Sequence, residues 1–250
     1  MTDQLLAITY NGPIAYVQMN REDKRNSFNV ALIEALNDTA QALRKRRDIK
    51  VIVLSGTTKC FSAGADLADP LQFDATTTLA DKRHYALLGA ETARAWEQLP
   101  QVTVAAIERY AIGGGLGLAL ACDFRVAGES AFLWVPEVEI GANYGWNTVP
   151  RLISLIGPAR TRRMVLLAER IGSAQAHEWG LIDELVADGD TMEKAQALAE
   201  ILAKMPSMAL AVSKRAINVV AGALTDISSH GDMEQVLLCF SDWNREKSET

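Results

Sequence analysis

The chain has 250 residues, 49% of them hydrophobic and 22% charged, which is enough apolar material for a sizeable core in one large domain or two small ones. Its 25 Lys and Arg against 31 Asp and Glu leave a formal charge of −6, so a nucleic-acid partner is not expected, although local cations could still hold a small anion. Three scattered cysteines without a CxxC motif indicate reduced thiols in the cytoplasm. With no targeting signal and no apolar run of about 20 residues, we expect no membrane association.

Hydrophobic spacing predicts alternating strands and helices over the first 150 residues. Residues 5–10 and 14–19 flank Asn11-Gly12 and read as a hairpin, and residues 30–46 have helical spacing. Residues 51–54 form a continuous apolar run of the buried-strand type. The next predicted elements are a helix over 79–99 ended by Pro100, a buried strand over 102–107, a helix over 116–122, and strands over 124–127 and 131–134.

Beyond Pro150 the pattern is mainly helical. The predicted helices cover 151–156, 159–168, 173–179 with Gly180 as C-cap, 191–205, 210–221 and 227–243. Alternating strands and helices followed by helices alone indicate an α/β core with a helical tail.

The first candidate motif is the loop that follows the buried strand, residues 61–67 (FSAGADL). Small side chains let a ligand approach the backbone closely, and Asp66 could cap the segment that follows. Taken alone, the loop is better explained as an ordinary tight turn whose glycine permits a positive φ, because such turns are common.

The second candidate is residues 111–123 (AIGGGLGLALACD), in which three glycines separate a buried strand from an apolar helix. Free N–H groups at a helix N-terminus, together with about half a positive charge from the helix dipole, suit an anion or a developing oxyanion. A dinucleotide fingerprint is the alternative, but its third glycine is missing and no βαβ unit precedes it.

The third candidate is residues 134–141 (WVPEVEIG), where Glu137 follows a short apolar strand. A carboxylate in an apolar pocket has a raised pKa and can move protons near neutral pH. A solvated loop carboxylate is the alternative.

The order and spacing of these motifs resemble the crotonase superfamily of enoyl-CoA hydratases and isomerases. Residues 20–27 (NREDKRNS) and 172–183 (GSAQAHEWGLID) extend the resemblance over about residues 5 to 220. It implies an α/β fold, a spiral of ββα repeats with a C-terminal α-helical trimerisation region. We divide the chain accordingly into a spiral core over 1–195 and a helical region over 196–250, and expect a homotrimer or a hexamer.

The resemblance also implies roles for individual residues. The backbone N–H groups of Ala65 and Gly114 would form an oxyanion hole for the thioester of an acyl-CoA, and Glu137 would be the acid/base. Coenzyme A would enter as part of the substrate, with no other cofactor and no metal. The residues expected to bind substrate or coenzyme A are Lys24, Arg25, Asn26, Ser27, Ala63, Asp66, Leu67, Gly113, Gly117, Trp134, Tyr144 and Trp146.

Three departures from the family pattern narrow the chemistry. Hydratases of the family carry a first glutamate where this chain has Gly117, so only Glu137 remains, and a single carboxylate favours isomerisation of a double bond over hydration. Tyr144 and Trp146 stand at positions that are normally small, so they either narrow the acyl pocket or pack against the tail helices. Only ten residues follow Phe240, so the family's C-terminal coenzyme A contacts are expected to be absent or supplied elsewhere. Hydration, thioester hydrolysis, decarboxylation, C–C cleavage and a non-catalytic acyl-CoA-binding role are the alternatives.

Overall fold

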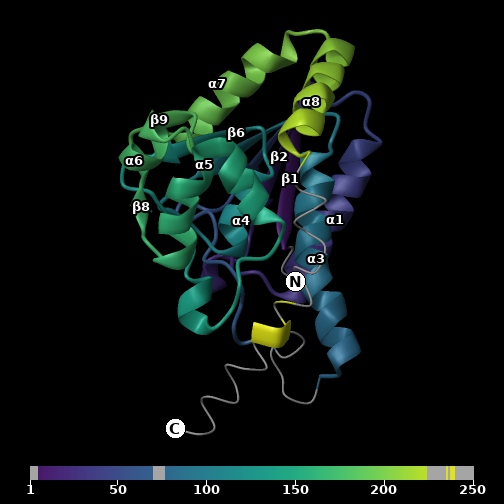
Figure 1. The fold of residues 1–250 in the computed structure, drawn as a ribbon. Coiled ribbons are helices and arrows are strands. Elements are labelled where there is room, and N and C mark those ends of the chain that lie inside the picture. Colours follow the sequence, from purple (N-terminus) through teal and green to yellow (C-terminus); the bar gives the residue numbers. More distant parts are fainter. Residues whose placement is uncertain (1–4, 70–76, 224–234, 236, 240–250) are drawn as a thin grey trace, which may run out of the picture.

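The computed structural model describes residues 5–69, 77–223, 235 and 237–239, and in it the chain forms two β-sheets with helices on both sides (Figure 1). The larger sheet contains, in spatial order, β1 (Leu6–Asn11), β2 (Ile14–Met19), β3 (Val51–Ser55), β4 (Val102–Ile107), β6 (Phe124–Gly128) and β9 (Glu184–Val186). The smaller sheet contains β5 (Tyr110–Ile112), β7 (Phe132–Trp134) and β8 (Ile171–Gly172).

The pairing pattern explains the hydrophobic runs of the sequence. β1 and β2 form the antiparallel hairpin expected around Asn11-Gly12, whereas each further neighbouring pair in the larger sheet is parallel. Parallel strands need crossover segments that cover the faces of the sheet, so their side chains are buried on both sides. Every residue of β3 and of β4 is accordingly buried.

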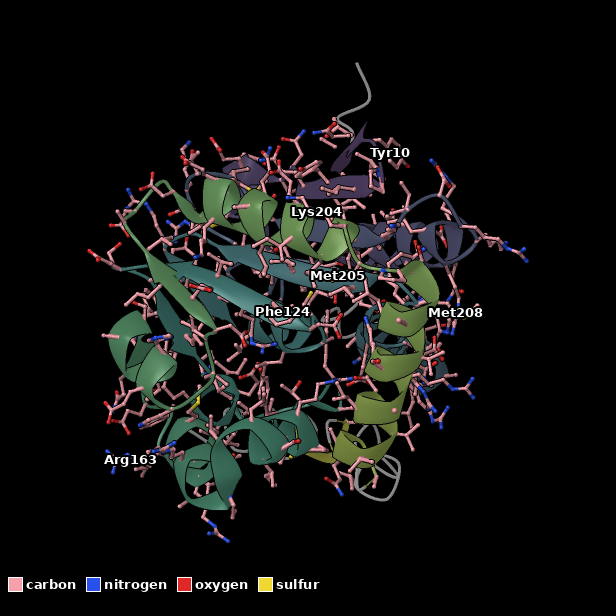
Figure 2. All side chains as sticks on the ribbon, turned by 90° about the horizontal axis from the view of Figure 1, so that it is seen from above. Tyr10, Phe124, Arg163, Lys204, Met205 and Met208 are labelled. Carbon is pink, nitrogen blue, oxygen red and sulfur yellow. The ribbon has the colours of Figure 1, made fainter. Side chains whose placement is uncertain are left out.

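Helices cover both faces of the larger sheet and also pack on the smaller one (Figure 1). They are η1 (Glu22–Lys24), α1 (Val30–Arg44), α3 (Leu79–Glu97), α4 (Gly114–Leu120), η2 (Glu137–Ile140), α5 (Thr148–Leu166), α6 (Ser173–Glu178), α7 (Thr191–Ala203) and α8 (Ser207–Ala221). α7 lies across one face of the larger sheet, where Ala195 and Ala199 pack with Val53 and Val104 (Figure 2). The chain changes direction near Met205, between α7 and α8 (Figure 2). The other face carries α1, α3 and α4 in the larger core.

Most boundaries follow from local chemistry. Asn29 caps α1 by accepting a hydrogen bond from the Leu32 N–H, and Thr78 caps α3 in the same way through Asp81. The two helices expected over 151–156 and 159–168 form one element, α5, broken at Gly157, whose φ of +74° and ψ of +166° interrupt the helix before Pro158.

The sequence prediction of an α/β fold is confirmed, with some differences in detail. The strands β5 and β8 are not predicted by the sequence pattern because they have only three and two residues, too few for a hydrophobic period. The short strand that the family resemblance implies after Gly180-Leu181 is β9. Helix α4 begins at Gly114, two residues earlier than expected. The predicted helix over 227–243 lies almost wholly outside the described residues. The division at residue 195 falls within α7 and stays a prediction. Within the described part of the chain, no helix has both the length and the hydropathy that a bilayer crossing requires.

Candidate active site

Two of the predicted loops lie side by side. Ser62, in the loop after β3, forms a parallel bridge with Ala111 of β5, and the Ile112 N–H donates to the Ser62 carbonyl at 3.1 Å. The two chains stay in contact beyond this bridge, because a Cβ placed on Gly64 would lie only 2.8 Å from the Ile112 carbonyl oxygen. Ala65 and Gly114 each lie three residues beyond the bridge, so this register brings them next to each other.

The backbone N–H groups of these two residues are available to a ligand. Phe28 pairs with the loop through the Gly64 carbonyl and the Asp66 N–H, which leaves the Ala65 N–H outside that ladder. Gly114 is the first residue of α4, where a helix provides no acceptor for an N–H. No hydrogen bond of the described residues uses either group as donor. Ala65 is exposed and Gly114 partly exposed, whereas the glycines beside them are buried.

A network of buried polar groups holds the first loop in place. Asn26, which is fully buried with a φ of +51°, accepts a hydrogen bond from the Arg21 N–H and donates to the Cys60 carbonyl. The Ser62 hydroxyl donates to the Asn26 carbonyl at 2.8 Å and accepts from the Gly64 N–H. Asn26 therefore holds the loop in position through buried hydrogen bonds, and its side chain is not exposed to a ligand.

Arg21 and Asp66 form a second support. The guanidinium lies 2.8 Å from the Asp66 carboxylate and donates to the Ser27 carbonyl at 2.6 Å. Partial burial would raise the pKa of Asp66, but the hydrogen bonds from Arg21 and from the Ala68 N–H outweigh this effect and lower it. Of the residues expected to bind coenzyme A, Asn26, Ser27 and Asp66 thus serve the scaffold. Others in the same two loops are exposed or partly exposed: Lys24, Arg25, Ala63 and Leu67.

Glu137 reaches the same place from the third loop. Glu137 follows β7, and the carbonyl of Trp134 in β7 accepts a hydrogen bond from the Gly113 N–H at 2.9 Å. The Oε1 atom of Glu137 lies only 2.5 Å from the position that a Cβ on Gly113 would take. Only glycine at position 113 leaves room for the carboxyl group. Its Oε2 is shielded from solvent and has no hydrogen-bond partner among the described residues. Burial raises the pKa of Glu137 to about 8, so this is not the solvated loop carboxylate considered as the alternative.

Position 117 carries no carboxylate, and a side chain there would be crowded at its first atom. A Cβ added to Gly117 would lie 3.0 Å from the Thr148 hydroxyl oxygen and 3.5 Å from the Trp146 Cβ. The side chains of Thr148 and Trp146 therefore lie next to the position that the first atom of a side chain at residue 117 would take.

Trp146 packs over the N-terminus of α4. Its ring stacks on Phe28 with centroids 5.3 Å apart, and its Cζ2 would lie 3.1 Å from a Cβ on Gly114. The indole also lies directly against Gly89 of α3. Of the two interpretations open from the sequence, a wall beside the thioester site fits these contacts, since the ring packs on Phe28 and on Gly89 of α3.

The backbone at Trp146 is held in an unusual conformation. Trp146 and Asn147 have φ values of +62° and +54°, which each cost free energy for a residue with a Cβ. Arg151 stabilises this turn, because its buried guanidinium donates to both carbonyls, at 2.8 and 3.0 Å. Glu97 of α3 accepts the other two hydrogen bonds of Arg151.

Gly89→Ala is expected to destabilise the protein by about 1–3 kcal/mol, because the new methyl group would overlap the indole of Trp146. In a Trp146→Ala background the same change should cost little, because the obstacle is gone. Urea unfolding of the two single variants and the double variant measures the coupling. Equal costs of Gly89→Ala in both backgrounds would contradict this position of the indole.

Two other predicted aromatic residues contribute in different ways. Tyr144 is buried, with 3% of its surface exposed, and its hydroxyl donates to the Gly113 carbonyl at 3.1 Å. The Trp134 indole donates to the Ala168 carbonyl and lies under Arg170, so only the backbone of Trp134 reaches the site.

Sequence reasoning missed several residues of the site. Arg21 and Ser62 lie inside quoted motifs but carry no signal of their partners, which are distant in sequence. Gly89 does carry a signal, because a glycine inside a helix is unfavourable unless a neighbour requires it. Phe28, Thr148 and Arg151 could be found only in three dimensions. Among the described residues, His, Cys, Asp and Glu form no group suited to holding a metal ion.

Comparison with known proteins gives a consistent result. The enoyl-CoA hydratase/isomerase family matches residues 9–236. The 2,3-dehydroadipyl-CoA hydratase of Escherichia coli is 33% identical over 85% of this chain and 81% of its own, and the crotonyl-CoA hydratase of Syntrophomonas wolfei is 28% identical over 95% and 90%. The crystal structure of an enoyl-CoA hydratase from Bacillus anthracis superposes with a TM-score of 0.81 at 32% identity, covering 92% of this chain and 90% of that one.

The matched region contains the two loops, the glycine triplet and the glutamate described above, within a fold shared over nearly the whole chain. The chain therefore belongs to the enoyl-CoA hydratase/isomerase family of the crotonase superfamily and is an enzyme of the hydratase/isomerase kind.

Proposed function

We propose that this enzyme is an enoyl-CoA isomerase that moves a β,γ-double bond into conjugation with the thioester, using Glu137 as its single acid/base. The observation that carries the proposal is the state of position 117. Gly117 has no side chain to carry a carboxylate, and Thr148 and Trp146 lie beside it. A mechanism that needs two carboxylates lacks its second one, whereas a proton shuttle needs only one.

The reaction would proceed through an enolate. The thioester oxygen accepts hydrogen bonds from the Ala65 and Gly114 N–H groups, which stabilise the negative charge that develops there. Ionised Glu137 removes a proton from the α-carbon, the electrons delocalise through the β,γ-double bond, and the protonated carboxyl returns the proton to the γ-carbon. Lys24 and Arg25, exposed at the end of η1, are placed to attract the phosphates of coenzyme A.

Hydration is the second candidate, favoured by the names of the relatives, which include a 2,3-dehydroadipyl-CoA hydratase and a crotonyl-CoA hydratase. Separate assays with a 3-enoyl-CoA and a 2-enoyl-CoA distinguish the two. Isomerisation of the first without hydration of the second supports the proposal. Efficient hydration of the 2-enoyl-CoA would overturn it, and tight binding of both esters without turnover would indicate a non-catalytic binding protein.

Isomerisation is expected to accelerate with pH up to about 8. The base must be ionised, and burial raises the pKa of Glu137 to about 8, so kcat/KM should fall about tenfold for each pH unit below that value. A pH profile at low concentrations of 3-enoyl-CoA measures this directly. A rate that is flat between pH 5 and pH 8 would show that Glu137 is not the base.

We propose a cytoplasmic homotrimer or hexamer as the working form. Cys60 and Cys122 are free and buried, and burial raises the pKa of both thiols, as expected for unreactive thiols in a reducing compartment. α8 exposes Met208, Val212 and Val220, with 76%, 59% and 78% of their surfaces accessible in the single chain. Exposed apolar side chains grouped on one helix favour burial between subunits.

A further inference from the structure

The buried hydroxyl of Tyr144 is the feature of the site that the proposed mechanism leaves unused. It donates a hydrogen bond of 3.1 Å to the Gly113 carbonyl, an oxygen that also accepts the Gly117 N–H at 2.9 Å. The Gly113 carbonyl and the Gly114 N–H belong to the same peptide unit. Tyr144 therefore contacts the opposite end of the group that we assign to the oxyanion hole.

From this geometry we infer that Tyr144 is a positioning residue for the oxyanion hole, acting through the Gly113–Gly114 peptide. A trans peptide is planar and its carbonyl and N–H point in opposite directions, so a bond that fixes the oxygen also fixes the direction of the N–H. Hydrogen bonds in series also polarise one another, so a donor on the carbonyl strengthens the N–H as a donor to substrate. The inference rests on the proposed use of Gly114.

The conformation of Gly113 explains why the Gly113–Gly114 peptide needs a hydrogen bond from Tyr144. Gly113 has a φ of +50° and a ψ of −123°, outside the helical region, and it immediately precedes the first turn of α4. The adjacent peptide is thus not held by regular helix geometry on its N-terminal side. Its carbonyl accepts two hydrogen bonds, one from the Gly117 N–H and one from the Tyr144 hydroxyl, whereas the Gly113 N–H belongs to the preceding peptide and donates to the Trp134 carbonyl.

The surroundings keep the phenol in the donor role. Burial, followed by the nearby negative charge of Glu137, raises the pKa of Tyr144 well above its usual value, so the hydroxyl keeps its proton at any working pH. That proton is committed to the Gly113 carbonyl, so Tyr144 is not the proton donor to substrate that its phenol alone would suggest. Tyr144 acts on the thioester only through the peptide.

The test compares Tyr144→Phe with the wild type by carbon-13 NMR of bound butyryl-CoA labelled at the thioester carbonyl, a saturated ester that cannot isomerise or be hydrated. A strong oxyanion hole polarises this carbonyl and shifts its resonance from the value in solution. We expect Tyr144→Phe to lose a large part of this shift. In turnover, kcat for a 3-enoyl-CoA should fall about tenfold with KM nearly unchanged, less than the about 10²–10³-fold loss typical when a donor itself is removed.

Tyr16→Phe is the matched control. Its hydroxyl is likewise buried and has no hydrogen-bond partner among the described residues, and it packs with the cluster under α7 on the other face of the sheet. This variant should keep both the carbonyl shift and kcat. If Tyr144→Phe folds poorly, 3-fluorotyrosine placed at position 144 alone provides a second test, because its more acidic phenol should increase the shift.

The outcomes separate this inference from the proposed function. A carbonyl shift that is unchanged in Tyr144→Phe would overturn the inference, whatever the turnover. A shift that depends on Tyr144 in an enzyme that does not isomerise 3-enoyl-CoA would support the inference and overturn the isomerase. A wild type that produces no shift would overturn both, because no oxyanion hole would then act on the thioester.

Discussion

Glu137→Gln is expected to lower kcat for isomerisation of a 3-enoyl-CoA by about 10³–10⁴-fold. The amide keeps the size of the side chain but can neither accept the α-proton nor return one to the γ-carbon, and general acid–base catalysis by a positioned group contributes up to about 10⁴-fold. KM should change little, since the N–H groups that bind the thioester are untouched. The measurement is steady-state turnover followed by the absorbance of the conjugated product.

Glu139→Gln provides the control for this variant. Glu139 lies two residues after Glu137 in the same short helix, η2, but its side chain is exposed. The Glu139→Gln variant should therefore retain full activity. If Glu137→Gln kept a tenth or more of wild-type kcat, the proton would have to be moved by another group, and the one-carboxylate site would be wrong.

The same substitution should change how stability depends on pH. The ordinary pKa of a glutamate, 4.5, applies to the unfolded chain, whereas burial raises the pKa of Glu137 to about 8 in the folded one. Between these values the folded state binds more protons than the unfolded state, so the free energy of unfolding falls as pH rises. This contribution to stability is complete below pH 4.5, and about 5 kcal/mol of it is lost by pH 8.

Glu137→Gln removes this titration and should gain stability relative to the wild type as pH rises. The gain between pH 5 and pH 9 corresponds to an increase of roughly 10 °C or more in Tm for a chain of this size. Thermal unfolding of both proteins across that range tests it, with Glu139→Gln expected to follow the wild type. Parallel curves for Glu137→Gln and the wild type would show that the carboxyl is not shielded. Burying this group thus lowers stability in return for a base that works near neutral pH.

Much of the fold could be predicted because local patterns agree with the tertiary structure. The Asn11-Gly12 turn, the fully apolar runs of β3 and β4 and the capped helices α1 and α3 all carry their signals within a few residues. The short strand β5 carries none, although it aligns the first loop with the glycine triplet. Its three residues pair with segments distant in sequence, which no local period can reveal.

The site, like the fold, has parts that the sequence predicts and parts that depend on contacts between distant residues. The glycine triplet, the FSAGADL loop and Glu137 could be recognised from spacing, because a backbone that must approach a ligand or another chain closely requires small residues. The reason for each glycine was not accessible: Gly113 makes room for Glu137, and Gly115 makes room for Ser62. The position of Trp146 was also left open, because its contacts with Phe28 and Gly89 join three separate parts of the chain.

Transfer of deuterium within the substrate tests the central claim, that one shielded carboxyl group acts at both carbons. A 3-enoyl-CoA carrying deuterium at the α-carbon is converted in ordinary water, and the position of the label in the product is determined by mass spectrometry and NMR. Because the Oε2 of Glu137 is shielded from solvent, we expect a substantial fraction of the product to carry deuterium at the γ-carbon. A γ-carbon hydrogen that comes entirely from water would contradict the account.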